Sequence, residues 1–120
     1  MKIKNIKFKA KQLNSGKWFE GDLVRLGNRV CIGGDHIKDG ITDVDPSTVC
    51  QFTGLTDYDG KDLYEGDIIS FSDSYNQVVW EDDLCAFVLV DVESHSYYVH
   101  CDILKNCPFY IVGNKFDKKK

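Results

Sequence analysis

Apolar and polar residues alternate along much of this chain, and a period of two residues is typical of half-buried β-strands. In residues 6–10 apolar side chains alternate with lysines, so we expect a strand with its apolar side chains inward. Residues 18–26 and 29–32 predict a hairpin around Gly27-Asn28, because this pair readily adopts the positive φ angles of a tight turn. The N-terminal half is therefore expected to be built on a β-hairpin.

The rest of the chain continues this pattern. Residues 45–48 predict a turn or a single helical turn, with Asp45 as its cap and Pro46 at its first position. Asn76 is expected at a hairpin tip. Further strands are expected over residues 49–53, 68–72, 77–81, 86–92, 96–101 and 110–113. Because many short strands must close or stack to bury their apolar faces, we predict a mainly β fold whose second half is a small antiparallel barrel.

A short phrase occurs twice, as Trp-Phe-Glu-Gly-Asp-Leu-Val around Glu20-Gly21-Asp22 and as Leu-Tyr-Glu-Gly-Asp-Ile-Ile around Glu65-Gly66-Asp67. A glycine between acids before a β-branched strand indicates a sharp entry into a sheet, with the aspartate accepting backbone hydrogen bonds. The alternative is that these carboxylates pair for acid/base or metal chemistry. No histidine, serine or lysine occupies a matching position in both phrases. We therefore interpret both as structural corners.

Length and composition favour one folded domain over residues 1–120. The chain is 42% apolar and 12% aromatic, which argues against disorder. The doubled phrase leaves open a division into subdomains 1–43 and 44–117 with a basic tail, Lys118 to Lys120. No stretch approaches the ~20 apolar residues that a membrane span needs, and the charged start lacks the apolar core of a signal peptide. We expect a cytoplasmic protein with no membrane partner.

The five cysteines do not suggest a disulfide framework or a metal site. They are odd in number, contain no Cys-x-x-Cys pair and lie among apolar neighbours, so they are interpreted as small buried hydrophobic residues. The best metal candidates are His95, His100, Cys101 and Cys107. Consecutive residues of a strand point to opposite faces, so His100 and Cys101 are poorly placed to bind one ion. No metal and no cofactor are expected.

The net charge of −4 conceals a strong segregation of charge. Residues 1–30 carry eight basic side chains against two acids, whereas residues 31–104 carry two lysines against sixteen acids. The acidic middle disfavours a nucleic-acid duplex lying across it. Lys7, Lys9 and Lys11 are candidate phosphate contacts. The alternatives are an edge strand that lysines protect from aggregation, and a strand that meets the acidic half of a neighbouring chain.

A candidate interaction surface lies in the middle of the chain, where polar and aromatic residues surround a turn. Its members are Gln51, Thr53, Asp57, Tyr58 and Asp59. Turns are the usual location for recognition. The alternative is a structural bend whose polar groups satisfy the backbone.

The segment Val44 to Asp67 reads V-D-P-S-T-V-C-Q-F-T-G-L-T-D-Y-D-G-K-D-L-Y-E-G-D, and it is accompanied by I-K-F-K-A, K-W-F-E-G-D-L, V-V-W and F-Y-I-V-G-N. This succession resembles the YopX family of bacteriophage and prophage proteins over nearly the whole chain. Cys50 departs from the family pattern, which more often has a small residue there. The resemblance implies a β-rich domain that forms homo-oligomers in a bacterial host cell, and it supplies no catalytic residues.

Two functions remain at this point. The first is a non-enzymatic phage accessory protein, a homo-oligomeric module that binds an unknown protein partner or assembles with copies of itself. The second is a nucleic-acid-associated protein that uses the basic N-terminal strand and the C-terminal tail. The second half is also similar in style to SH3-like barrels, which is an analogy of fold alone.

Overall fold

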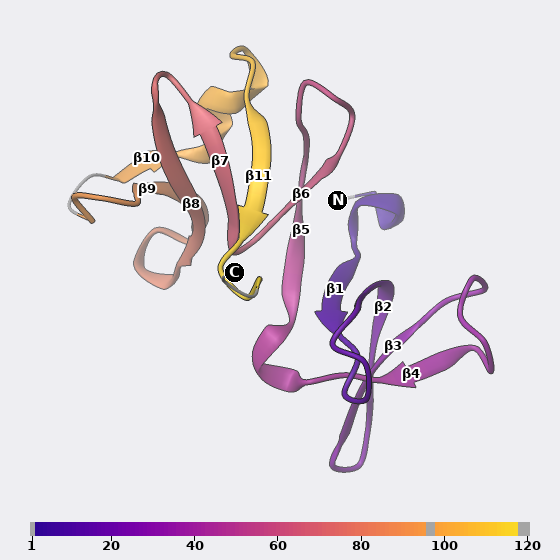
Figure 1. The fold of residues 1–120 in the computed structure, drawn as a ribbon. Coiled ribbons are helices and arrows are strands. Elements are labelled where there is room, and N and C mark those ends of the chain that lie inside the picture. The colour runs from indigo at the N-terminus through magenta and orange to yellow at the C-terminus, as the bar shows by residue number, and fades with distance from the viewer. Residues whose placement is uncertain (1, 96–97, 118–120) are drawn as a thin grey trace. The chain divides into compact units, whose positions relative to one another are not determined.

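The computed structural model describes residues 2–95 and 98–117, and within these ranges it contains eleven β-strands, four short 3-10 helices and no α-helix (Figure 1). The mainly β class is therefore confirmed. The chain divides into two compact units, Met1–Phe52 and Thr53–Lys120, each with its own core. The division falls inside a strand, whereas the sequence suggested a boundary between residues 43 and 44.

The first unit is an antiparallel sheet. Its elements are η1 (Ile3–Asn5), β1 (Phe8–Lys11), β2 (Trp18–Leu26), β3 (Arg29–Gly33), β4 (Ile41–Asp43), η2 (Pro46–Thr48) and the start of β5 (Cys50–Thr56). The sheet order is β4-β3-β2-β1-β5, followed by β6 (Asp62–Tyr64) of the second unit. Because β1 pairs with β2 on one side and β5 on the other, it is not an edge strand. The interpretation of its lysines as protection of an edge is wrong.

Local sequence determines two features of this unit that were predicted. The hairpin between β2 and β3 turns at Gly27-Asn28, and Gly27 has a φ of 59°. The carboxylate of Asp45 accepts a hydrogen bond from the Ser47 amide at 3.0 Å and thereby caps η2, which begins at Pro46. Both predictions are confirmed.

The core of the first unit lies on one face of its sheet. Its buried members are Ala10, Ile32, Ile37 and Val44, packed against Phe8, Phe19, Leu23, Val30 and Val49. Side chains of β1 alternate between this core and the opposite face. Lys7, Lys9 and Lys11 therefore lie on the face away from the core.

The second unit is built on a five-stranded antiparallel sheet. Its elements are the rest of β5, β6 (Asp62–Tyr64), β7 (Asp67–Phe71), β8 (Ser74–Glu81), η3 (Asp82–Leu84), β9 (Ala86–Asp91), β10 (Tyr98–His100), η4 (Cys101–Lys105) and β11 (Tyr110–Asn114). The sheet order is β10-β9-β8-β7-β11. Its core contains Leu63, Ile69, Val78, Leu89, Cys101, Leu104 and Phe109. Val78 and Leu89 lie opposite each other in the register, and they identify the inward face of the sheet.

Closure into a small barrel, which the sequence predicted, is not observed. Among the described strands the five-stranded sheet ends at β10 on one side and β11 on the other, so it is open. Short alternating strands satisfy a closed or an open sheet equally well, because both bury one apolar face. The pattern alone did not distinguish them.

The prediction that Asn76 lies at a hairpin tip is wrong. Asn76 is inside β8, paired with Asp91, and it is buried at 8% exposure. The turn is instead formed by Ser72 and Asp73, which have φ angles of 50° and 63°. Ser72, Asp73, Ser74 and Asn76 are all good turn formers, so pairing with the neighbouring strand decides where the chain reverses.

Some sequence predictions fall on residues outside the described ranges. They are the basic tail Lys118 to Lys120 and the beginning of the strand expected over residues 96–101. In the part of the chain that the structure describes, no helix has the length and apolar character needed to cross a membrane.

Candidate interaction site

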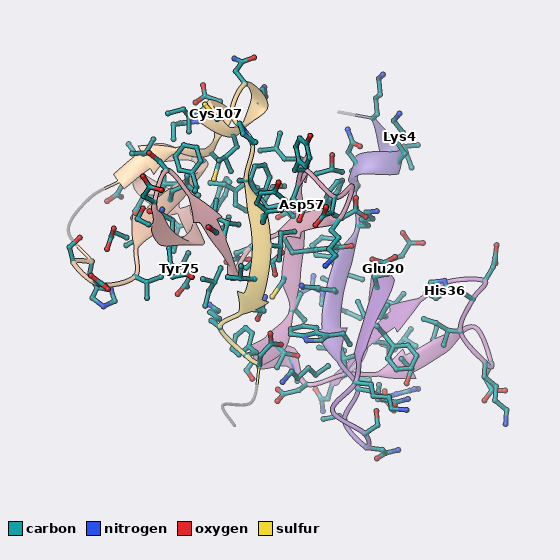
Figure 2. All side chains as sticks on the ribbon, turned by 45° about the horizontal axis from the view of Figure 1, so that its top comes forward. Lys4, Glu20, His36, Asp57, Tyr75 and Cys107 are labelled. Atoms are coloured by element: carbon teal, nitrogen blue, oxygen red, sulfur yellow. The ribbon has the colours of Figure 1, made fainter. Side chains whose placement is uncertain are left out.

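Asp57 begins the turn between β5 and β6, and it has a structural role there (Figure 2). One carboxylate oxygen accepts hydrogen bonds from the amides of Asp59 at 3.0 Å and Lys61 at 2.8 Å. The other accepts from the amide of Ile111 in β11 at 3.0 Å. The side chain is 6% exposed. Asp57 therefore fixes the turn and holds it against β11.

The environment of Asp57 lowers its pKa. Burial by itself raises the pKa of this carboxyl, because the charged form loses water. The hydrogen bonds from the Ile111, Lys61 and Asp59 amides favour the charged form and together outweigh burial, so the pKa lies below its usual value of 3.8. The carboxylate is thus stable in its charged form at neutral pH.

Tyr58, the next residue, is the exposed part of the turn. Its amide donates to the Phe109 carbonyl at 3.0 Å, while its side chain is 70% exposed. The ring lies 5.6 Å from the ring of Tyr110, tilted by 57°, which is a favourable arrangement for an aromatic pair. Tyr110 is itself 43% exposed. Two parts of the sequence thus contribute one exposed aromatic pair.

A surface depression of about 380 Å³ lies beside this pair. One side is formed by Thr56, Asp57 and Tyr58, and the other by residues 104–109, the segment from the end of η4 to the start of β11 that includes Cys107 (Figure 2). Lys105 supplies the basic side chain of the lining. The pair and the depression together, called the Tyr58–Tyr110 surface below, lie wholly within the second unit.

The other residues of the predicted interaction surface are placed differently. Thr53 donates its hydroxyl to the Leu63 carbonyl at 2.8 Å, so it joins β5 to β6. Gln51 lies opposite Phe8 in the first unit, on the other side of the division of the chain. Asp59 is exposed in the turn. Among the five predicted residues, Tyr58 and Asp59 are the exposed ones.

The two Glu-Gly-Asp phrases have different settings. Glu20-Gly21-Asp22 lies inside β2, where pairing passes from β1 to β3. Glu65-Gly66 forms the turn between β6 and β7, and Asp67 is buried at the start of β7. Asp67 accepts hydrogen bonds from the Tyr64 amide at 2.8 Å and from the side-chain amide of Asn114 at 2.9 Å. The phrases are thus a strand interior and a turn.

Asp57 and Asp67 together attach both ends of β11 to the central segment of the chain. Asp57 bonds to Ile111 near the start of the strand, and Asp67 bonds to Asn114 at its end. A backbone hydrogen bond of 2.9 Å from Lys115 to Gly66 adds a further contact. Sequence reasoning missed this role, because both partners lie far along the chain from the acids that bind them.

The candidate phosphate contacts form one row along β1, with Lys7 immediately before the strand and Lys9 and Lys11 within it. The ammonium group of Lys7 lies 4.6 Å from the ring centre of Phe52, and those of Lys9 and Lys11 lie 4.8 and 5.4 Å from the ring of Trp18. Cations over aromatic faces are attracted by the ring quadrupole. The structure therefore orders three positive charges side by side, and we call this row the lysine face.

The cysteines and histidines do not form a common site in the described part of the chain. No group of three or more His, Cys, Asp or Glu side chains in residues 2–95 and 98–117 is placed to hold a metal ion. His100 pairs with Asp102 at 3.3 Å. Burial, with a smaller contribution from Asp102, raises the pKa of the Cys101 thiol to about 12. Cys85 is exposed, which corrects the expectation that every cysteine is buried.

Comparisons with known proteins support one assignment. None of the curated proteins compared with the chain matches it. A family model described as YopX protein matches residues 4–119, which is nearly the whole chain. The central segment that carries Asp57 and Asp67 lies within this match, so the residues that fasten β11 are part of the matched region. The chain belongs to the YopX protein family.

Proposed function

We propose that this chain is a non-enzymatic protein-binding module that forms homo-oligomers and serves a bacteriophage or prophage in the cytoplasm of its host. The observation that carries the proposal is the Tyr58–Tyr110 surface. Tyr58 and Tyr110 are large, exposed side chains beside a depression that a partner's side chain would fill. Tyrosines of this kind are enriched at protein interfaces, because they bury a large apolar area while the hydroxyl keeps a polar partner.

The burial and hydrogen bonding of the nearby carboxylates support a binding function rather than catalysis. Asp57 and Asp67 are the buried acids of the central segment, and both bond to backbone or amide groups of their own unit. A general acid or base needs a carboxyl that can reach a substrate. The similarity in style to SH3-like domains, where aromatic grooves bind peptides, is an analogy that favours the same role.

Two measurements test the proposal. Sedimentation velocity over a wide concentration series should show species larger than the monomer. Affinity capture from phage-infected host cells should recover a protein that the Tyr58→Ala/Tyr110→Ala variant fails to recover. Leu84→Ala is the control, because it removes an exposed apolar side chain of the same unit outside the depression. A monomer at every concentration, with captured proteins unchanged by the double substitution, contradicts the proposal.

The lysine face favours nucleic-acid binding as a second candidate function. Lysines beside aromatic rings are typical of surfaces that follow a single-stranded backbone. Fluorescence anisotropy with single-stranded DNA and RNA oligonucleotides should then show binding that weakens steeply with salt. The absence of salt-dependent binding near physiological ionic strength removes this candidate.

A further inference from the structure

The two units carry opposite net charge. The first unit, residues 1–52, has nine basic side chains against six acidic ones. Within residues 53–117 of the second unit there are three lysines against thirteen acids. A surface of the first unit and a surface of the second are therefore electrostatically complementary, whereas two copies of either surface repel each other.

The outward face of the five-stranded sheet, which is the face away from Val78 and Leu89 of the core, carries several valines. Val79 and Val90 are half-buried there, whereas Val88, which lies opposite Val79, is 1% exposed and is already covered within the chain. A sheet with one wet face usually alternates apolar and polar residues, while near-continuous apolar runs are typical of strands covered on both faces. The run from Ala86 to Val90 is of the second kind.

A hollow of about 270 Å³ opens on this outward face. It is lined by Gln77, Val79, Glu81, Val90, Asp91, Val92 and His95. Its floor is apolar, from Val79 of β8 and Val90 of β9, and Glu81 lies at its margin, whereas the carboxylate of Asp91 already accepts hydrogen bonds from the amides of Glu93 and Ser94. This combination suits a lysine side chain, whose apolar stem packs on aliphatic groups while its ammonium group meets a carboxylate.

The lysine face of the first unit has the matching properties. Lys7, Lys9 and Lys11 occupy alternate positions of one strand, so they share a face, and each ammonium group is already ordered over an aromatic ring. Side chains that are ordered before binding lose less conformational entropy on association. A straight row of such lysines fits an open hollow on a sheet face better than a deep pocket.

We propose that the lysine face of one copy docks on the outward sheet face of a second copy, with lysine side chains entering the hollow beside Glu81. This inference names the contact through which the proposed homo-oligomer forms, and so it rests on the proposed function. The two surfaces differ, so the contact is head to tail, and each copy offers one surface of each kind. Such contacts close into a ring or continue as a filament.

The decisive experiment mixes two complementary variants. Lys7→Glu/Lys9→Glu/Lys11→Glu removes the lysine face and keeps the hollow, whereas Gln77→Ala/Glu81→Ala removes the polar and acidic side chains of the hollow, adds no positive charge and keeps the lysine face. Each variant alone should self-associate at least about tenfold more weakly than the wild type. A mixture of the two should form a one-to-one complex and nothing larger, because one complementary pair of surfaces remains. Light scattering coupled to size-exclusion chromatography measures each species.

A matched control and a measurement on the wild type complete the test. Lys2→Glu/Lys4→Glu/Lys17→Glu changes the net charge equally at lysines outside the face, and it should leave the oligomer intact. Carbodiimide cross-linking of mixed isotope-labelled and unlabelled wild-type protein should join Lys7, Lys9 or Lys11 of one copy to Glu81 of another. This readout needs no substitution, so it decides the inference even if a variant fails to fold.

The outcomes separate the inference from the function on which it rests. A wild-type protein that is monomeric at every concentration, even at low salt, overturns the inference and the homo-oligomeric part of the proposed function, and the capture experiment then decides whether the protein-binding part stands. An oligomer that survives the reversal of the lysine face, with no one-to-one complex in the mixture, overturns the inference and leaves the oligomeric module standing. If the reversal abolishes binding to an oligonucleotide and leaves the mass of the oligomer unchanged, the lysine face binds nucleic acid and the inference is wrong.

Discussion

The carboxylate of Asp57 accepts a hydrogen bond from the backbone amide of Ile111, at 3.0 Å and across 54 positions of the sequence. This bond attaches the turn of the central segment to the C-terminal strand β11. It also holds Tyr58, the residue after the aspartate, beside Tyr110, the residue before the isoleucine. The buried acid thus positions the two rings of the Tyr58–Tyr110 surface without being part of the exposed surface itself.

Replacing Asp57 should destabilise the protein. Asp57→Ala leaves the amides of Asp59, Lys61 and Ile111 without this acceptor, and unpaired buried donors cost about 1–3 kcal/mol each, so a loss of about 3 kcal/mol is expected. Urea unfolding measures the change. Asp59→Ala is the control, because Asp59 lies in the same turn but is exposed. Its free energy of unfolding should be within about 0.5 kcal/mol of the wild-type value. Equal effects of the two substitutions would show that the Asp57 bonds do not matter.

Asp57 should also make stability depend on pH. Its pKa is lower in the folded protein than the unfolded value near 3.8, so its contribution is complete above that value and is lost as pH falls through the folded pKa. Asp57→Asn keeps a carbonyl acceptor but does not titrate. The free energy of unfolding of the wild type should therefore fall more steeply with acidification below about pH 5 than that of the variant. Parallel pH profiles would contradict this assignment.

Local features of the fold were predictable from the sequence, because their causes are local. The β2–β3 hairpin needs only alternating residues on each side of Gly27-Asn28, and η2 needs only a capping aspartate before a proline. The strands Ile41–Asp43 and Asp62–Tyr64 were not predicted. Three residues are too few to establish a period, so strands of this length are defined by their neighbours.

The candidate site was predictable in part. The turn chemistry around residues 57–61 pointed to the loop that carries Tyr58. The partner ring of Tyr110 and the amide of Ile111 were not predictable, because a strand pattern does not say which distant turn it will meet. The repeated Glu-Gly-Asp phrase has the expected structure at one of its two places: Asp67 begins β7 and accepts the Tyr64 amide, whereas Glu20-Gly21-Asp22 lies inside β2. The neighbouring strands, and not the phrase itself, decide that its first occurrence is the interior of a strand and its second a turn.

The two glycines of the repeated phrase should respond very differently to alanine. Gly21 has a φ of 154°, and a Cβ there would overlap the carbonyl oxygen of Gly33 in the paired strand. Gly66 has a φ of 87°, but its Cβ would meet no atom closer than 3.4 Å. Gly66→Ala should lower the free energy of unfolding by about 1–2 kcal/mol, from backbone strain alone. Gly21→Ala should cost about 3 kcal/mol or more, because overlap is added to strain.

Thermal unfolding of the two glycine variants, followed by circular dichroism, gives the comparison directly. Gly54→Ala is a useful reference, because Gly54 has a φ of 91° and open space where the Cβ would be. The loss of stability caused by Gly54→Ala should match the loss caused by Gly66→Ala and be smaller than the loss caused by Gly21→Ala. If Gly21→Ala proved the mildest of the three, the close approach of β2 and β3 at Gly33 would be excluded.

The cysteines should divide sharply in their reactivity with a thiol reagent at neutral pH. Cys85 is exposed, so it should react first. Burial raises the pKa of Cys101 to about 12, and a thiol that stays protonated and inaccessible is a poor nucleophile. Cys101 should therefore react only when the second unit unfolds. Mass spectrometry of the labelled protein after increasing times identifies each site.

The control for this prediction is Cys85→Ser, which should abolish the fast phase of labelling and leave the slow phases unchanged. Addition of urea above the unfolding midpoint should make the rate at Cys101 approach that of Cys85, because unfolding removes the burial that raises its pKa. Fast labelling of Cys101 in the folded protein would contradict its place in the core, together with Leu104 and Phe109, beneath the five-stranded sheet.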